Sequence, residues 1–437
     1  MKTSSYSPDK VKQKLADFFD KRHINKVSKK TGFIVRQCKK IPAYEFVTSL
    51  IFCFLGKQNT FSAWARHISE QTGESVSKQA LFKKMGASTT AFCKQLLEDA
   101  LLKKTKALKG SNVFKSFKKV LLQDSTTFKL AACLKAIFPG NHSGGVQKAV
   151  MRIQTLLDIK TMQFIHFSIS GFNRNDQAAS GDVLAFCSKG DLVIRDLGYF
   201  SLKVFDKIKA SGADLLSRLR FGVNLYDLDG KEIVLKTLLK AGQKVDMQVL
   251  VGEHRVPMRL VLLPMPKDKV AERKRKANTD RDKRLNHSRL YYKWLEFSAY
   301  ITTVNEGVWT TENVGEAYST RWQIEIVFKS WKSGGTHLPQ LLHERCTNAE
   351  RVKACIYLML LFITLFSQNI YLPILKKMVA REQEKVVSLL KLFAWVCSNL
   401  VKIICLTEAQ LIKKALEICP YDKRNDRQSL MAKIIKR

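Results

Sequence analysis

The chain has 437 residues, of which 46% are hydrophobic and 26% charged, so it can bury a large core and is too apolar to be wholly disordered. Its 75 lysines and arginines stand against 38 acidic residues, a formal net charge of +37. Such a surplus repels itself in a compact fold and is typical of proteins that bind a polyanion, with nucleic acid as the leading candidate. The alternative is a basic protein that has no such partner.

Neither membrane insertion nor secretion is expected. The longest apolar run, Ala354–Phe366, is shorter than the roughly 20 residues that span a bilayer, and it predicts a buried helix. The basic, polar start lacks the apolar segment of a secretory signal. The ten cysteines form no C-x-x-C pair, and His343 with Cys346 has no second ligand pair at zinc-site spacing, so we expect reduced thiols in an intracellular protein.

The first 110 residues are expected to be helical. Apolar residues at helical spacing predict helices over Val11–Phe19 and Ala43–Leu55. A pair of helices is predicted from Phe61 to about Glu70 and after Ser77, with Gly73 at the turn. The second helix carries Lys78, Lys83 and Lys84, so the pair is either a helix-turn-helix that enters a major groove or an ordinary helical hairpin.

From about residue 113 the pattern changes to that of a mixed α/β core. Three antiparallel strands are predicted near Val120–Leu122, Ala149–Leu157 and Phe164–Ile169. A helix over Gln177–Ser188, a strand over Asp191–Ile194 and a helix from Ser201 to Ile208 are expected to follow.

Further strands are predicted at Glu232–Leu235, Val245–Val251, Met258–Leu263 and Glu296–Val304, with Pro257 just before the third. The stretch Lys267–Lys293 between the last two carries a net charge of +7, has Tyr291 and Tyr292 near its end and is followed by Trp294. Basic residues beside aromatic residues suit contact with a nucleic-acid backbone and stacking on bases, although a charge run is usually a solvated face. From residue 314 onward the chain is expected to be helical.

The segment YSTRWQIEIVFKSWK at 318–332 carries the most chemistry. On one helix, at about 100° per residue, Tyr318, Arg321, Glu325 and Lys332 fall within one narrow stripe. Ile324, Val327 and Trp331 fall on the other side and predict a docking face.

Two aspartates accompany this glutamate. Asp124 follows the apolar strand VLLQ, and Asp196 ends the strand DLVIR. Carboxylates at strand ends of an open α/β sheet face the crevice where ligands bind. Each alone is more often a turn or cap residue, but together with Glu325 they offer the oxygen ligands that Mg²⁺ or Mn²⁺ prefers.

The set resembles the DDE transposases of bacterial insertion sequences, in particular the subgroup (insertion-sequence family 4) with the signature Y-x2-R-x3-E-x6-K. The signature stands complete at 318–332, and QDSTTF around Asp124 and RDLGYFS around Asp196 look like the family's two aspartate strands. Residues 267–287 are longer and more charged than the family pattern, and the residue after Asp196 is not basic.

The resemblance implies an RNase H-like catalytic core interrupted by a mostly β insertion. The expected parts are a helical DNA-end-binding region at 1–110, the core at 111–220 and 296–375, the insertion with its basic linker at 221–295, and a helical, dimerising region at 376–437.

It also implies metal-dependent cut-and-paste transposition, with two Mg²⁺ ions (or Mn²⁺) held by Asp124, Asp196 and Glu325. The expected partners are double-stranded DNA, as terminal inverted repeats and target, and a second copy of the chain, in a bacterial, nucleoid-associated setting without a membrane. DNA contacts are implied for Tyr318, Arg321, Lys329, Lys332 and Trp294, the last by stacking on an extruded base. For Trp294 the alternative is a core-filling aromatic, and for the whole chain the alternatives are a non-catalytic DNA-binding repressor and a two-metal nuclease.

Overall fold

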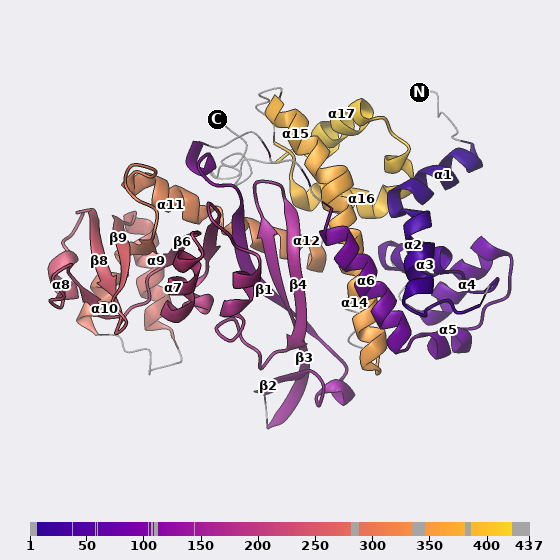
Figure 1. The fold of residues 1–437 in the computed structure, drawn as a ribbon, viewed down its shortest axis with the longest axis horizontal. Coiled ribbons are helices and arrows are strands. Elements are labelled where there is room, and N and C mark those ends of the chain that lie inside the picture. The colour runs from indigo at the N-terminus through magenta and orange to yellow at the C-terminus, as the bar shows by residue number, and fades with distance from the viewer. Residues whose placement is uncertain are drawn as a thin grey trace.

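The computed structural model describes residues 7–421 except 37, 57, 59, 104, 106, 107, 109–111, 144, 281–287, 334–345 and 381–385. His343 and the middle of the basic linker lie outside the described residues. Helices from both ends of the chain pack side by side at one end of the molecule, and a long sheet extends away from them (Figure 1).

The N-terminal helices are α1 (Pro8–Phe19), α2 (Lys21–Lys30), α3 (Ala43–Leu55), α4 (Phe61–Thr72), α5 (Lys78–Lys84) and α6 (Ala87–Leu101). Predicted helix starts and stops are confirmed in α3, α4 and α5. Ser77 caps α5 by accepting a hydrogen bond from the Ala80 amide, and Gly73 ends α4 at a φ of 73°.

The α4–α5 pair presents only part of its predicted basic surface. Lys78 and Lys83 are exposed, whereas the Lys84 ammonium donates to the Phe33 carbonyl and lies 4.3 Å from the centre of the Phe33 ring. Burial lowers the pKa of Lys84. Both interpretations of this helix pair, as a groove-reading motif or as a hairpin, therefore remain hypotheses.

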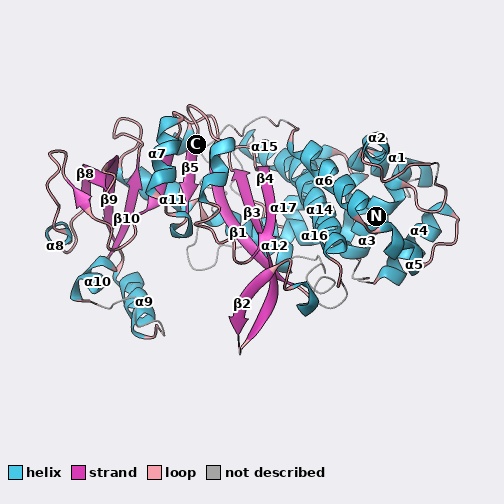
Figure 2. Ribbon diagram, turned by 60° about the horizontal axis from the view of Figure 1, so that its bottom comes forward, coloured by secondary structure: helices cyan, strands magenta, loops and turns pink. Residues whose placement is uncertain are grey.

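The centre of the molecule is a sheet that begins with three antiparallel strands, as predicted: β1 (Val120–Lys129), β3 (Val146–Asp158) and β4 (Gln163–Gly171). Two strands parallel to β1 follow, β5 (Leu192–Arg195) and β6 (Asp214–Arg218). The short β2 (Pro139–Ser143) pairs with the start of β3, and this hairpin projects from the body (Figure 2).

The same sheet continues into the region predicted as an insertion. Beyond β6 lie β10 (Phe297–Thr302), β9 (Val256–Pro264), β8 (Val245–Val251) and β7 (Leu225–Tyr226), in that spatial order. The helices α9 (Lys267–Asn278) and α10 (Arg289–Trp294) connect β9 to β10. Arg273 of α9 is turned inward and donates to the Phe297 carbonyl at 2.8 Å, so part of the basic stretch has a structural role.

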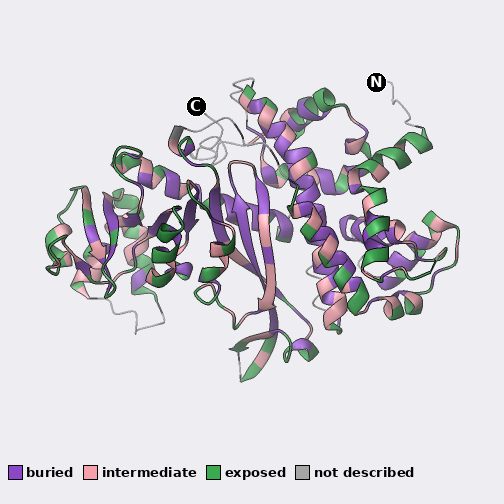
Figure 3. Ribbon diagram, in the orientation of Figure 1, coloured by how far each residue is buried: buried purple, intermediate pink, exposed green. Residues whose placement is uncertain are grey.

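The sheet separates two hydrophobic cores. Val120 and Leu122 of β1 belong to the larger core, which the N- and C-terminal helices complete. Leu121 belongs to the smaller core, which is shared with α7 (Leu202–Ala210) and the insertion strands. Alternate residues of β1 therefore face different layers, as strand geometry requires. The buried positions run through the central strands and helices (Figure 3).

Three predicted elements differ from the structure. The stretch Gln177–Ser188 contains only a short 3₁₀ helix, η3 (Ser180–Ala185), in which amides bond mainly three residues back and the Ala179 and Ser180 carbonyls accept from side chains of β1 and β5. Glu232–Leu235 is not a strand: Glu232 makes one isolated bridge, and α8 (Leu235–Leu238) follows. Pro257 lies inside β9 rather than before it.

The remaining helical elements are η1 (Asn112–Phe114), η2 (Ala132–Leu134), η4 (Leu197–Tyr199), α11 (Thr311–Ser319), α12 (Trp322–Ser333), α14 (Ala349–Phe366), the π-helical η6 (Ser367–Tyr371), α15 (Leu372–Ala380), α16 (Leu389–Ile404) and α17 (Glu408–Ile418). Among the described residues, Ala349–Ala380 is the one helical stretch long and apolar enough to cross a membrane, but 89% of its apolar window is buried inside the protein. The prediction of a buried helix there is confirmed. All ten cysteines carry free thiols.

Candidate active site on β1 and after β5

Asp124 lies in the middle of β1, which continues to Lys129, and not at a strand end as the sequence predicted, whereas Asp196 directly follows β5. The two aspartates lie side by side on the sheet. Gln123 of β1 pairs with Arg195 of the parallel strand β5. The residues that follow them, Asp124 and Asp196, are therefore neighbours across the two strands. Neighbouring strands are about 4.8 Å apart. Both aspartates continue the face that carries Leu122 and Ile194 into the larger core, which is the face that α12 covers.

The segment that carries the signature is not one continuous helix, and here the prediction was wrong. α11 ends at Ser319 and α12 begins at Trp322. Thr320 and Arg321 form a tight turn, in which the Arg321 amide donates to the Tyr318 carbonyl at 3.0 Å and the Ile324 amide donates to the Arg321 carbonyl at 3.2 Å. The predicted docking face is confirmed, because Ile324, Val327 and Trp331 are buried.

One guanidinium lies among the three predicted carboxylates. Arg321 Nη2 is 2.7 Å from Glu325 Oε1, Nη1 is 3.4 Å from Asp124 Oδ2, and Nε is 3.5 Å from Asp196 Oδ1. The Tyr318 hydroxyl donates to Asp196 Oδ1 at 3.4 Å. The structure thus brings together five of the eight residues to which the sequence assigned a role in the site, from two strands and two helices that are distant in the chain.

Charge and burial act against each other at Asp124. Burial raises the pKa of Asp124 to about 7, while the Ser125 amide and the Arg321 guanidinium favour the ionised form. Asp196 and a further carboxylate, Asp176, raise the pKa again. A second positive charge beside Asp124 would lower the pKa of this carboxyl group, since a nearby cation favours the carboxylate form.

The donor set suits a divalent cation. Three carboxylates supply hard oxygen ligands, and they already surround a positive group. Within the described part of the chain, however, no three His, Cys, Asp or Glu side chains are gathered closely enough to form a metal site by themselves. The difference is Arg321, which occupies the space between the carboxylates.

Lys332 and Lys329 lie further along α12, and both are exposed. The Lys332 ammonium is 5.5 Å from the centre of the Phe128 ring, and Phe128 is on the same face of β1 as Asp124. Burial of its stem lowers the pKa of Lys332. Lys332 therefore extends along the strand that carries the first aspartate.

The indole of Trp294 is not exposed for the base stacking that the family resemblance implied. Its side chain is only 8% exposed and packs against Phe221 in the smaller core, at 5.8 Å between ring centres. The exposed aromatic is Trp322, at 52%, with the Arg321 guanidinium 5.0 Å from its ring centre. Its helical angle puts it beside the Tyr318–Glu325 stripe and away from the apolar face, so the pattern contained the information needed to find it.

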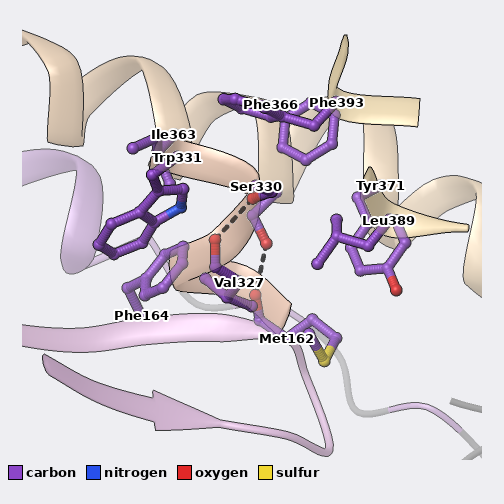
Figure 4. Close-up of a pocket in the computed structure, with 11 residues that line it drawn as sticks. Met162, Phe164, Val327, Ser330, Trp331, Ile363, Phe366, Tyr371, Leu389 and Phe393 are labelled. Carbon is purple, nitrogen blue, oxygen red and sulfur yellow. Dashed lines mark hydrogen bonds between the residues drawn. The ribbon is translucent and has the colours of Figure 1, made fainter. Parts of the chain in front are cut away.

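A pocket behind α12 serves packing rather than ligand binding. It is lined mainly by apolar side chains (Figure 4), and Ser330 and Ser367 donate to the carbonyls of Val327 and Met162. Val327 is on the face of α12 that docks into the larger core. Such a lining offers nothing to a phosphate or a metal ion.

The chain is similar to known proteins over most of its length. Residues 115–365 match the family model described as "Transposase DDE domain". The chain is 28% identical to the transposase for insertion sequence element IS231B of Bacillus thuringiensis subsp. berliner, over 80% of this chain and 77% of that protein. It is 26% identical to the transposase for insertion sequence element IS1151 of Clostridium perfringens, over 88% and 85%.

The structure also aligns with the piggyBac transposase synaptic complex with hairpin DNA, over 94% of this chain and 86% of that chain, with a TM-score of 0.44 and 10% identity. This similarity is too low to support a conclusion about fold or function. The family match is sufficient, because it spans more than half of the chain and includes Asp124, Asp196 and Glu325. The chain belongs to the family of transposases with a DDE domain.

Proposed function

We propose that this protein is a DNA transposase that excises an insertion sequence and joins it to new DNA, using Asp124, Asp196 and Glu325 as a DDE triad. The observation that carries the proposal is the meeting of these three carboxylates, from β1, β5 and α12, at one guanidinium. The relatives' names, which describe transposases of insertion sequences, point to the same substrate.

The proposed catalytic core is RNase H-like. The strand order β4-β3-β1-β5-β6, with three antiparallel strands followed by two strands parallel to β1, supports it. In this scheme 111–220 and 296–375 form the core, 221–295 the insertion, 1–110 the end-binding region and 376–437 a dimerising region. A dimer fits an enzyme that acts on two DNA ends.

Two Mg²⁺ ions on the triad would activate the attacking oxygen and stabilise the leaving oxygen of a phosphodiester. With metal bound, the carboxylates would release Arg321, and its guanidinium would then be available to the phosphate beside the scissile bond. Tyr318 stays against Asp196 and fixes the orientation of that carboxylate. Lys332, farther along α12, binds a phosphate of the same strand, and Lys329 is assigned to the same backbone.

The proposed reaction begins with water nicking the element end. The freed 3′-hydroxyl attacks the opposite strand to form a hairpin, the hairpin is reopened, and the 3′-hydroxyl then joins target DNA. Forming a hairpin requires a base near the end to leave the stack. We assign the stacking surface for that base to the exposed Trp322 and keep Trp294 as a packing residue.

The test uses a supercoiled plasmid that carries the element's terminal repeats, incubated with the protein and Mg²⁺ and scored for nicks, hairpins, excision and joining. The single variants Asp124→Ala, Asp196→Ala and Glu325→Ala should each lose all cleavage while binding of the end fragment is retained. Cleavage at the wild-type rate by any one variant would remove that residue from the triad. A repressor would bind the ends without cleaving them, and a nuclease would cleave without joining.

A further inference from the structure

The residues that flank the two aspartates point to the opposite face of the sheet and enter a polar network there. Gln123 and Ser125 flank Asp124, and Arg195 precedes Asp196. Because side chains alternate along a strand, these three lie behind the candidate site. Gln123 and Arg195 are 3% and 0% exposed.

The first half of the network ties β1 to β5. The Arg195 guanidinium donates to the Gln123 side-chain oxygen and to the Ser180 carbonyl, and the Gln123 amide donates to the Ala179 carbonyl at 2.9 Å. The residues that precede both aspartates are thereby bound to each other and to the segment between β4 and β5, here called the covering segment. Each of these groups would be costly to bury without its partner.

The second half converges on Asp176. Its Oδ1 accepts hydrogen bonds from Ser125 Oγ at 2.7 Å, Arg152 Nη1 at 2.6 Å and Gln154 Nε2 at 3.2 Å. Arg152 also donates to Ser125 Oγ at 3.0 Å. The residue directly after Asp124 is therefore held by an ion pair whose arginine side chain is only 9% exposed.

Asp176 also lies against the turn that follows the second aspartate. A Cβ atom built on Gly198 would be 3.3 Å from Asp176 Oδ2, so this carboxylate lies close to the backbone two residues after Asp196 and leaves little room for a side chain there. One side chain thus bonds to the residue after Asp124 and lies close to the turn after Asp196.

We propose that Asp176 is a positioning residue that fixes Asp124 and Asp196 in register for binding divalent metal, acting through Ser125 and through the turn at Gly198. The inference rests on the proposed function, because it takes the two aspartates as metal ligands. Asp176 itself does not contact the metal or DNA. Its ion pair with Arg152 holds this part of β1 rigid from behind, in the manner of outer partners that orient metal ligands.

The test compares Asp176→Ala, Asp176→Asn and Ser125→Ala with a matched control, Asp182→Asn. Asp182 belongs to the same covering segment and also accepts from an arginine, Arg174, at 2.6 Å, but it has no hydrogen bond to β1 among those of the described residues. Metal affinity is measured by calorimetry with Ca²⁺ and Mn²⁺, alongside single-turnover cleavage, end binding and thermal unfolding.

Asp176→Ala should weaken metal binding and cleavage by about 10- to 100-fold, as loss of an outer partner does, while end binding is unchanged. Asp176→Asn keeps an acceptor oxygen for Ser125 and should lose less, which also covers the case in which the alanine variant does not fold. The double variant with Asp176→Ala and Ser125→Ala should lose less metal affinity than the product of the two single fold-losses, because both substitutions remove the same hydrogen bond.

Folded Asp176 variants with wild-type metal affinity would overturn the inference, even if their unfolding temperature fell. Equal losses in Asp182→Asn would overturn it as well, because they would show a general effect of the covering segment. Failure of the proposed function looks different: wild-type protein would then neither bind metal nor cleave, or Asp124→Ala would match wild type.

Discussion

Arg321 Nη2 lies 2.7 Å from Glu325 Oε1, one helical turn away, and the same guanidinium contacts both aspartates. Its side chain is only 8% exposed, so the charge of the guanidinium is balanced mainly by these carboxylates and little by water. The acids of the candidate site therefore gather around a cation before any metal binds, which keeps three negative charges compatible with a folded core.

The first prediction concerns the shape of that cation. Arg321→Lys keeps the charge, but its ammonium is a point charge and lacks the planar fork with which the Arg321 guanidinium would hold the phosphate beside the scissile bond. We expect DNA cleavage to fall by about 100-fold or more, the cost of losing a preorganised electrostatic partner. Cleavage at a saturating concentration of end DNA is the measurement. Arg174→Lys, which changes a partly exposed ion pair, is the control and should cleave at the wild-type rate.

The second prediction concerns pH. Burial raises the pKa of Asp124 from 3.8 to about 7. An acid with a higher pKa in the folded state takes up a proton on folding between those two values, so its contribution to stability falls as the pH rises through that window. Asp124→Asn should therefore raise the unfolding temperature of the metal-free protein at pH 8 and have little effect at pH 4.

Thermal unfolding of both proteins at pH 4, 6 and 8 without metal measures the difference. The matched control is Asp246→Asn, because Arg259, at 2.6 Å, helps to lower the pKa of Asp246, and the sign should be reversed. A stability difference for Asp124→Asn that does not change between pH 4 and pH 8 would contradict the raised pKa.

The sequence predicts the strands of the central sheet well because alternation and apolar runs are local properties. Strands β1, β3 and β4 and helix α3 lie where the patterns put them. The break at Thr320–Arg321 could not be predicted in this way, since no proline or glycine marks it and it arises from docking α11 and α12 separately. The helix expected at Gln177–Ser188 is a short 3₁₀ helix instead, and side chains of β1 and β5 donate to the Ala179 and Ser180 carbonyls, contacts that the local pattern does not contain.

At the site, the sequence identifies residues by type, and the fold decides which way they face. Helical spacing places Trp322 away from the apolar face of α12, and its side chain is 52% exposed, whereas the 8% exposure of Trp294 depends on the layers packed against it. Asp176 stands in a polar loop without any pattern of its own, so its contact with Ser125 could not be inferred before the strands were paired. The catalytic roles of the triad remain predictions until cleavage is measured.

The third prediction concerns phosphate contact by Lys332. Removing one lysine that neutralises a phosphate should lower the slope of log affinity against log salt by about one unit. Lys332→Ala should show this change with end DNA and should also cleave more slowly. Lys413, exposed on α17, provides the control variant Lys413→Ala. An unchanged slope for Lys332→Ala would show that its ammonium contacts no phosphate.

The fourth prediction separates the two tryptophans. Base stacking on an aromatic side chain contributes about 1–3 kcal/mol, so Trp322→Ala should slow hairpin formation by about 5- to 150-fold and leave the first nick nearly unchanged. Trp294→Ala instead removes a buried ring, which typically costs about 3–5 kcal/mol of stability. It should lower the unfolding temperature and reduce both steps in proportion to the folded fraction.

Quantifying nicked and hairpin products over time, with thermal unfolding of each variant, tells the two roles apart. Trp322→Phe keeps a stacking face and should recover most of the hairpin rate, whereas Trp322→Leu should not. If Trp294→Ala were as stable as wild type and lost only hairpin formation, the stacking role would belong to Trp294, and α10 would have to open in the DNA complex to expose its ring.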